Sequence, residues 1–242
     1  MKKLFKSVLC LSLFVTTFAN AQWSSKNTIK GNGKIITEKR STTDYDEIKI
    51  AGFFDIELIA GKEGNITLLG EENIVPKIKT EVENGVLKIY TEKNISLTTK
   101  KKLIITIPFE SLNAVTLAGS GDVTSKAIIK TEDFSVKLAG SGDLNLIVEA
   151  ANVDAQLSGS GDLNLSGKAT NLKANVAGSG AIAAAALITQ NAEANISGSG
   201  AITLYCTAAL KARVSGSGDV FYKGDPKTKD TKVSGSGAIS NK

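Results

Sequence analysis

Apolar and polar side chains alternate along much of the C-terminal half of the chain. Between residues 136 and 146, one parity carries Val136, Leu138 and Leu144, and the other parity is mainly polar. A period of two is typical of a β-strand that buries one face and exposes the other. Gly140 and Gly142 fall on the apolar side, which predicts a narrow interior or a sharp bend without room for a Cβ atom.

A second alternating stretch follows in each repeat of this pattern, for example at Val153, Ala155 and Leu157. The polar segments between the two stretches are predicted to be turns, at residues 149–152, 166–171 and 189–193. Each repeat is therefore expected to hold two or three short strands joined by corners.

The repeat is marked by a Gly-Ser-Gly triplet that recurs every 18 to 21 residues. Its seven copies begin at Gly119, Gly140, Gly159, Gly178, Gly198, Gly216 and Gly235. A unit this short cannot bury its own apolar face, so the copies must stack. Stacking at about 4.8 Å per turn gives a rod of roughly 34 Å.

The fold class predicted from this repeat is all-β, a right-handed parallel β-helix with about 19 residues per coil. A helical repeat is disfavoured because the units are rich in glycine and β-branched residues.

The N-terminal part has a different pattern and is predicted to form a β cap. Residues 22–44 are polar and are expected to be a loose lead-in. Longer strands are predicted at residues 47–50, 53–59, 65–69, 78–83, 86–90 and 103–107, with Pro108 closing the last. The segment 51–56 echoes 118–123 and predicts a degenerate first turn, bearing Phe53 and Phe54 as extra apolar cover. A cap is expected because an open solenoid end exposes strand edges.

Residues 1–21 are predicted to be a signal peptide. Lys2, Lys3 and Lys6 precede an uncharged, mostly apolar run that ends in an Ala-x-Ala site at Ala21. The protein is therefore expected to be exported, to the periplasm or to the cell surface and extracellular space. A membrane anchor is disfavoured because the run is short, and a lipoprotein signal because Cys10 lies within the apolar run.

The expected domain organisation is a signal peptide at 1–21, the lead-in at 22–44 and one domain at 45–242. Within that domain, 45–115 forms the cap and first coils, and 116–242 forms the seven Gly-Ser-Gly coils.

Charge and cysteine content limit which partners and which covalent bonds the chain is expected to have. Removal of the signal peptide takes away three lysines and leaves 26 basic against 24 acidic residues. The basic character of the chain is thus mostly a property of the signal, and no nucleic-acid partner is expected. Cys206 is the one cysteine left, so no intramolecular disulfide can form. Its apolar surroundings favour a small buried side chain over a reactive thiol.

Several classes of chemistry are excluded by what the sequence lacks. The chain has no histidine, which removes Ser-His-Asp triads, Cys-His dyads and His-ligated zinc. No Gly-Lys-Ser/Thr follows the glycines, and no helix is predicted after them, which argues against phosphate-loop and dinucleotide sites. No cofactor and no metal are therefore expected.

The acidic residues after the triplets are the candidate site. Asp122, Asp143, Asp162 and Asp219 follow Gly-Ser-Gly, and in-register stacking would bring the first three to one face as a weak cation or glycan site. The alternatives are a solvated face neutralised by lysines, or carboxylates that hydrogen-bond their own turn. The serines of the triplets would form a row of hydroxyls, explained by mutual hydrogen bonds and tight fit or by sugar contacts.

Three segments together resemble a known family. They are Gly-Phe-Phe-Asp-Ile-Glu-Leu at 52–58, Val-Glu-Asn-Gly-Val-Leu-Lys-Ile at 82–89, and the repeated Gly-Ser-Gly-Asp. The pattern resembles the putative auto-transporter adhesin, head GIN domain family over about residues 45–240. The resemblance implies a right-handed β-helix, export and an adhesin-like role, and it offers no catalytic residues to carry over. The chain departs from the motif at Ala181, Ala201 and Ala238, which replace the aspartate.

The leading functional hypothesis is a non-catalytic, exported, adhesin-like or envelope-associated binding or structural protein. Its expected partner is a cell-surface glycan or an envelope protein, and the mature chain is expected to have no transmembrane span. One alternative is a carbohydrate-active enzyme, a polysaccharide lyase or hydrolase that uses acids such as Asp143 and Asp162. Another is a purely structural component of the cell envelope. The sequence leaves the oligomeric state open.

Overall fold

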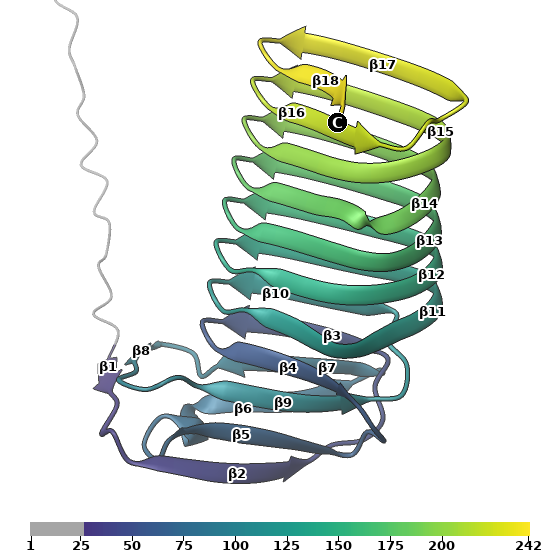
Figure 1. Ribbon diagram of the computed structural model, residues 1–242. Helices are drawn as coiled ribbons and strands as arrows, with labels where there is room; N and C mark the ends of the chain where they lie inside the picture. The colour runs from purple at the N-terminus through teal and green to yellow at the C-terminus, as the bar shows by residue number, and fades with distance from the viewer. Residues whose placement is uncertain (1–26) are drawn as a thin grey trace, which may run out of the picture.

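The computed structural model describes residues 27–242, which form a nearly all-β solenoid of about seven turns with about 19 residues per turn (Figure 1). The fold predicted from the repeat is confirmed in this respect. The predicted signal peptide at 1–21 lies outside the described residues. Between residues 27 and 242, no helix has the length and apolar character needed to cross a membrane.

Each coil of the C-terminal half consists of one long, curved strand rather than several short ones. These strands are β11 (Val123–Gly140), β12 (Leu144–Gly159), β13 (Asp162–Gly178), β14 (Ala181–Gly198) and β15 (Ala201–Gly216). Neighbouring strands pair in parallel and in register, so that Gly140 lies beside Gly159, and Gly159 beside Gly178.

The turns predicted at 149–152, 166–171 and 189–193 are wrong, because these segments lie inside β12, β13 and β14. Their backbones pair with the next coil, as Glu149 does with Lys168. The bend is made within the strand, at Gly167 with a φ of 112° and at register shifts such as the one between Asn164 and Ser166. Polar composition suggested turns here, but pairing between coils holds the backbone extended through the corner.

The interior is a continuous aliphatic column, as the alternation predicted. Equivalent positions in successive coils carry Leu138, Leu157, Val176, Ile196 and Val214, and all are at most 3% exposed. Burial of each such side chain contributes roughly 1.5–3 kcal/mol. The second glycine of the first six triplets is buried on the same side, as Gly142 is.

The degenerate first turn is confirmed. Strands β3 (Glu47–Gly52) and β4 (Asp55–Ala60) pair in parallel with β10 (Ala114–Gly119) and the start of β11, so Gly52 lies beside Gly119. Phe54 is almost completely buried, whereas Phe53 is half-buried. The observed strands differ from the predicted ones by one or two residues, and β9 (Ile104–Phe109) continues through Pro108, which pairs with Ile59.

The N-terminal end is closed by antiparallel strands. β2 (Ile35–Ser41) pairs with β5 (Asn65–Glu71), which also pairs with β9, and β6 (Ile78–Glu83) pairs with β7 (Val86–Thr91). β1 (Asn27–Lys30) pairs in parallel with β8 (Ile95–Thr98), and a short 3-10 helix spans Val75–Lys77.

The loose lead-in predicted at 22–44 is therefore corrected from residue 27 onward, because β1 and β2 belong to this segment. Side chains from the lead-in also bind the cap. Arg40 donates hydrogen bonds to the carbonyl oxygens of Ile78 at 2.6 Å and Val75 at 2.9 Å.

The C-terminal end is formed by β16 (Asp219–Lys223), β17 (Thr228–Gly235) and β18 (Ala238–Asn241). Every residue of β17 is exposed. Lys229 stacks on Leu210 and Thr231 on Ala212, so polar side chains occupy positions that are apolar in the coil below. Two interior positions at this end are thus polar, a recognised way of blunting an open strand edge, while Val233 continues the apolar column above Val214.

Candidate functional site

The Gly-Ser-Gly corners have a steric explanation. A Cβ atom on Gly140, whose φ is 142°, would lie 2.1 Å from the carbonyl oxygen of Gly119 in the previous coil. A Cβ atom on Gly142 would lie 2.0 Å from the carbonyl oxygen of Gly121. The backbone of the neighbouring coil, rather than the side chains of the interior, therefore excludes larger residues from both positions.

The serine of each triplet is exposed, and its backbone rather than its hydroxyl holds the corner. The N–H groups of Ser141 and Gly142 both donate to the carbonyl oxygen of Gly119, at 3.0 and 3.2 Å. The later corners repeat this pair of bonds. Among the residues that the structure describes, no hydrogen bond joins two of these serine side chains, so mutual hydrogen bonding does not explain the row of hydroxyls.

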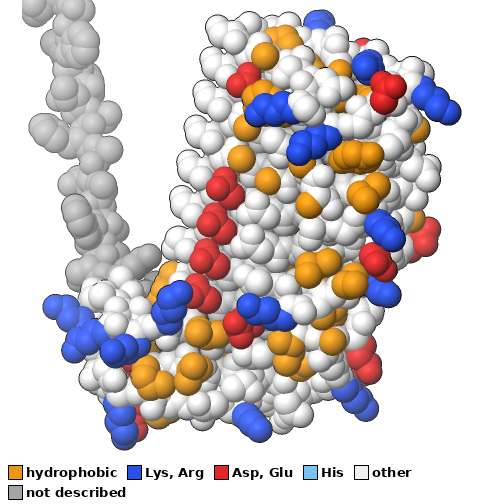
Figure 2. Space-filling view, in the orientation of Figure 1, with side chains coloured by type: hydrophobic (Ala, Val, Ile, Leu, Met, Phe, Trp, Pro, Cys, Tyr) orange, Lys and Arg blue, Asp and Glu red, His pale blue; other side chains and the backbone are white. Residues whose placement is uncertain are grey.

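The predicted acidic column is present in part. Asp122, Asp143 and Asp162 lie in consecutive coils, at or just before the start of β11, β12 and β13. Figure 2 shows a column of acidic side chains at the edge of one face of the solenoid. Asp219 is not brought to them, because Ala181 and Ala201 occupy the two intervening coils.

Each of these carboxylates accepts a hydrogen bond from the next coil, not from its own turn. Oδ1 of Asp122 accepts the N–H of Asp143 at 3.2 Å, and Oδ1 of Asp143 accepts the N–H of Asp162 at 3.0 Å. Asp162 and Asp219 do the same for the N–H groups of Ala181 and Ala238. The carboxylate thereby satisfies a backbone donor at the corner, where the regular ladder is interrupted.

In coils that follow an alanine, a glycine carbonyl oxygen replaces the carboxylate as the acceptor of this backbone N–H. Where the preceding coil carries Ala181, the N–H of Ala201 donates to the carbonyl oxygen of Gly180 at 3.2 Å. The N–H of Asp219, which follows the coil of Ala201, donates to the carbonyl oxygen of Gly200 at 3.2 Å. The variation between aspartate and alanine after the triplet thus has a structural account in the choice of acceptor.

No further chemistry is gathered around the acidic column. Across residues 27–242, no group of three or more His, Cys, Asp or Glu side chains is arranged to hold a metal ion. Asp143 and Asp162 stand side by side on one exposed edge, and neither lines the two grooves described below. The cation or glycan face expected at this column stays a prediction.

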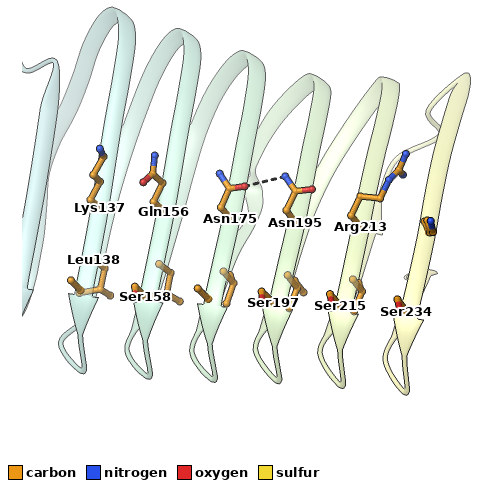
Figure 3. A pocket seen from close by; sticks show the side chains of 17 residues that line it. Lys137, Leu138, Gln156, Ser158, Asn175, Asn195, Ser197, Arg213, Ser215 and Ser234 are labelled. Atoms are coloured by element: carbon orange, nitrogen blue, oxygen red, sulfur yellow. Dashed lines mark hydrogen bonds between the residues drawn. The ribbon is translucent and has the colours of Figure 1, made fainter.

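A hollow lies on the other half of each coil and is called here the axial groove. It has a volume of about 760 Å³ and crosses the strands along the solenoid axis (Figure 3). One side is a polar column, formed by Lys137, Gln156, Asn175, Asn195, Arg213 and Lys232. The other is a small column, formed by Ala139, Ser158, Ala177, Ser197, Ser215 and Ser234. The groove arises because long and short side chains alternate across the sheet face.

Hydrogen bonds hold the polar column in place. Asn195 Nδ2 donates to Asn175 Oδ1 at 3.0 Å, the bond drawn in Figure 3, and to Glu193 Oε1 at 3.2 Å. The bond from Asn195 lowers the pKa of Glu193 against the desolvation that opposes it, with help from Lys211. Gln156 Nε2 donates to Asp154 Oδ2 at 2.8 Å.

A second groove of about 650 Å³ runs parallel to the first. It lies along a ladder in which Asn171 Nδ2 donates to Asn152 Oδ1 at 2.8 Å and Asn191 Nδ2 donates to Asn171 Oδ1 at 2.9 Å. Between the two grooves lies a charged column of alternating sign, formed by Asp154, Lys173, Glu193, Lys211 and Asp230. Opposite charges in adjacent coils stabilise the in-register stack.

Reasoning from the sequence missed the polar column. Its members all stand three positions before the first glycine of a triplet, as Lys137 does before Gly140 and Asn195 before Gly198. Alignment of the repeats on their glycines would have revealed this column, because parallel in-register stacking turns a constant offset into a line in space.

The prediction that Cys206 is a buried side chain is confirmed. Cys206 lies in β15, is fully buried and is free. Desolvation raises the pKa of its thiol above the usual range, which disfavours the reactive thiolate.

Comparisons with known proteins agree on the fold. Residues 44–226 match the family described as "Putative auto-transporter adhesin, head GIN domain". The chain is similar to the structure of a putative adhesin from Bacteroides fragilis NCTC 9343, with 26% identity and a TM-score of 0.82, covering 88% of this chain and 100% of that one.

The chain is also similar to a putative lipid binding protein from Parabacteroides distasonis ATCC 8503, with 29% identity, a TM-score of 0.75 and coverage of 89% and 100%. A putative adhesin from Parabacteroides merdae ATCC 43184 shares the fold, at 23% identity and a TM-score of 0.69, with coverage of 89% and 99%. Among curated proteins, no significant match was found.

Proposed function

Because the chain belongs to the putative auto-transporter adhesin, head GIN domain family, we propose that it is a non-catalytic, exported, adhesin-like protein that binds an extended ligand in the axial groove. The observation that carries the proposal is the groove itself, a hollow of about 760 Å³ that spans six coils. Amides, hydroxyls and cations stand along its sides, and alanines and the strand segments of buried aliphatic residues complete its lining. Such a surface offers many hydrogen bonds along one line, as an elongated glycan or envelope protein would require.

The same groove argues for binding without catalysis. No carboxylate, cysteine or histidine lines it, so it has no pair of groups for general acid and base chemistry. The acids that the enzyme hypothesis would use, Asp143 and Asp162, instead accept backbone hydrogen bonds at the corner. Product analysis with a panel of polysaccharides tests this point, and release of unsaturated or reducing ends would contradict it.

Export and domain organisation remain part of the proposal. We expect cleavage after Ala21 and a functional chain of residues 22–242, in the periplasm or at the cell surface. N-terminal sequencing of the secreted protein and protease treatment of intact cells would establish the cleavage site and the compartment.

Binding of lipid is a second candidate. One similar structure is named a putative lipid binding protein, and this chain exposes two paired aliphatic side chains, Ile128 and Ile147, at 43% and 37%. Sedimentation with phosphatidylglycerol vesicles tests it. An Ile128→Ser, Ile147→Ser variant that sediments as well as the parent would remove this candidate.

A binding screen against envelope glycans and envelope proteins tests the main proposal. The Ser197→Trp variant places a large side chain in the small column and is expected to abolish binding in the groove. Ala186→Trp, an exposed site on the other half of the same strand, is the matched control and should bind as the parent does. Equal binding by both variants would show that the ligand does not use the groove.

A further inference from the structure

The axial groove carries an imbalance of charge. Three cations line it, Lys137, Arg213 and Lys232, and no carboxylate does. All three belong to the polar column, and the small column opposite is uncharged. The net charge of the residues that line the groove is therefore positive, although the mature chain as a whole is close to neutral.

The nearest acids, Asp154 and Glu193, lie in the charged column beside the groove rather than in the groove itself, and each carboxylate accepts hydrogen bonds from neighbouring side chains. Asp154 accepts a hydrogen bond from Gln156 at 2.8 Å, and Glu193 accepts bonds from Asn195 at 3.2 Å and Lys211 at 3.3 Å. The amides of the polar column thus stand between these carboxylates and the groove.

The three cations are not equally free. Arg213 is held by Asp230, with the guanidinium 2.5 Å from the carboxylate. Over the described part of the chain, neither Lys137 nor Lys232 makes an ion pair, and both are exposed. They stand at the two ends of the column, five coils apart, which is about 24 Å at the usual strand spacing. A ligand that uses both must be extended and must carry more than one negative charge.

The middle of the groove indicates what kind of polyanion fits. Gln156, Asn175, Asn195 and the hydroxyls of the small column donate and accept hydrogen bonds, as sugar hydroxyl groups also do. No aromatic residue lines the groove, so a neutral glycan would lack a stacking surface. The strands beneath pair with their neighbours on both sides, so a peptide running along the groove finds no backbone edge to extend.

From these observations we propose that the ligand of the axial groove is a linear anionic polysaccharide, bound along the solenoid axis with its charged groups at Lys137 and Lys232. This inference rests on the proposed function and adds the chemical class of the ligand. Charge-assisted bonds to carboxylate or sulfate groups would anchor the chain at both ends, and the amides would bind its hydroxyls between them.

The test uses the mature chain, residues 22–242, and two pairs of polymers, each pair a charged chain and an uncharged counterpart with the same sugar backbone. Polygalacturonate is compared with its methyl ester, and dextran sulfate with dextran. Binding is measured by calorimetry at low and high NaCl. At least one charged polymer is expected to bind, its neutral counterpart at least about tenfold more weakly, with affinity falling as salt rises.

Variants decide whether the groove is responsible. Lys137→Gln and Lys232→Gln are each expected to weaken binding about five- to tenfold. Lys168→Gln is the control, since Lys168 is exposed at a corner outside the groove and the change in net charge is the same. The control should bind as the parent does.

Several outcomes would overturn the inference. The inference fails if neither charged polymer binds, or if a neutral polymer binds as tightly as its charged counterpart. It fails also if poly-glutamate, an anionic polymer without sugar hydroxyls, binds as tightly as the charged polysaccharide or more tightly. An equal loss of affinity in Lys168→Gln and in the two groove variants would likewise contradict it. If a neutral glycan binds and Ser197→Trp abolishes that binding, the groove stands and the charge argument fails. If Ser197→Trp has no effect on any ligand that binds, both the inference about the ligand and the proposed function of the groove fail.

Discussion

The aspartate that follows four of the seven triplets supplies a hydrogen-bond acceptor for the backbone of the next coil. Its Oδ1 atom does the work that a glycine carbonyl oxygen does in coils that follow an alanine. A side chain that looked like a ligand in the sequence is therefore also explained by the geometry of the corner.

Replacement of this acceptor should have a small and specific cost. We expect Asp143→Ala to lower stability by about 0.5–1.5 kcal/mol, because the N–H of Asp162 must find another acceptor. Asp143→Asn keeps an acceptor oxygen at the same place and should therefore lose less stability than Asp143→Ala. Thermal unfolding of both variants, monitored by circular dichroism, measures the difference, and an equal loss in both would contradict the role.

Thermal unfolding monitored by circular dichroism also tests the hypothesis that the acidic column binds a cation. Because each carboxylate already accepts a backbone N–H and no metal-holding group occurs within residues 27–242, we expect identical unfolding midpoints with Ca²⁺ and with a chelator. A midpoint raised by Ca²⁺ in the parent but not in Asp143→Ala would establish a cation site.

The buried glycine of the triplet should tolerate no side chain. A Cβ atom on Gly142 would lie 2.0 Å from a carbonyl oxygen of the previous coil, so Gly142→Ala must push two coils apart. The expected loss is about 1–3 kcal/mol, the range typical of overpacking. Ser141→Ala, an exposed neighbour, should change stability by less than about 0.5 kcal/mol. Urea unfolding of the two variants provides the comparison.

At the scale of elements, one buried carboxylate joins two loops of the N-terminal cap. Glu71, at the end of β5, is 1% exposed and accepts hydrogen bonds from the N–H groups of Gly33 at 2.5 Å and Lys100 at 2.8 Å. It thereby links the loop after β1 to the loop between β8 and β9. Desolvation opposes ionisation of Glu71, but these bonds outweigh it and hold its pKa below the usual range.

A lowered pKa makes the cap sensitive to acid. The contribution of Glu71 is fully present above the pKa of an unfolded glutamate, about 4.3, and is lost as the pH falls through its lower folded value. Hydrogen exchange of the Gly33 and Lys100 amides should therefore be slow at neutral pH and accelerate toward pH 3, after correction for intrinsic rates. In Glu71→Gln the two amides should exchange faster at neutral pH, with little further change on acidification. Unchanged protection in that variant would count against the link.

At the scale of the whole molecule, the two ends of the solenoid are closed by different means. Antiparallel strands cover the N-terminal end, as Figure 1 shows. At the other end, Lys229 and Thr231 stand where the coil below has Leu210 and Ala212. A further coil could not stack there without burying the ammonium group of Lys229, which is costly.

Removal of this polar end should make the protein self-associate. We expect a Lys229→Leu, Thr231→Val variant to sediment as a larger species than the parent, because it presents an apolar face and an open strand edge. Lys211→Leu, an outward position in the coil below, is the control and should leave the sedimentation unchanged. A double variant that sediments as the parent does would contradict the capping role.

The sequence by itself determined the repeat, the parallel stacking of coils and the buried set. Alternation of side chains is a local property of an extended strand, and seven triplets at nearly constant spacing leave one way to bury the apolar faces. Leu138, Leu157 and Val176 could be assigned to one interior column for this reason.

The tertiary structure decided where the backbone bends, what the aspartates do and where the groove runs. Residues 166–171 read as a turn, yet pairing with the neighbouring coils keeps them in β13. The acceptor role of Asp143 and the alignment of Lys137 with Lys232 depend on contacts between coils about 19 residues apart. Such contacts follow from the exact stagger of one coil on the next, which the order of residues within a single repeat does not specify.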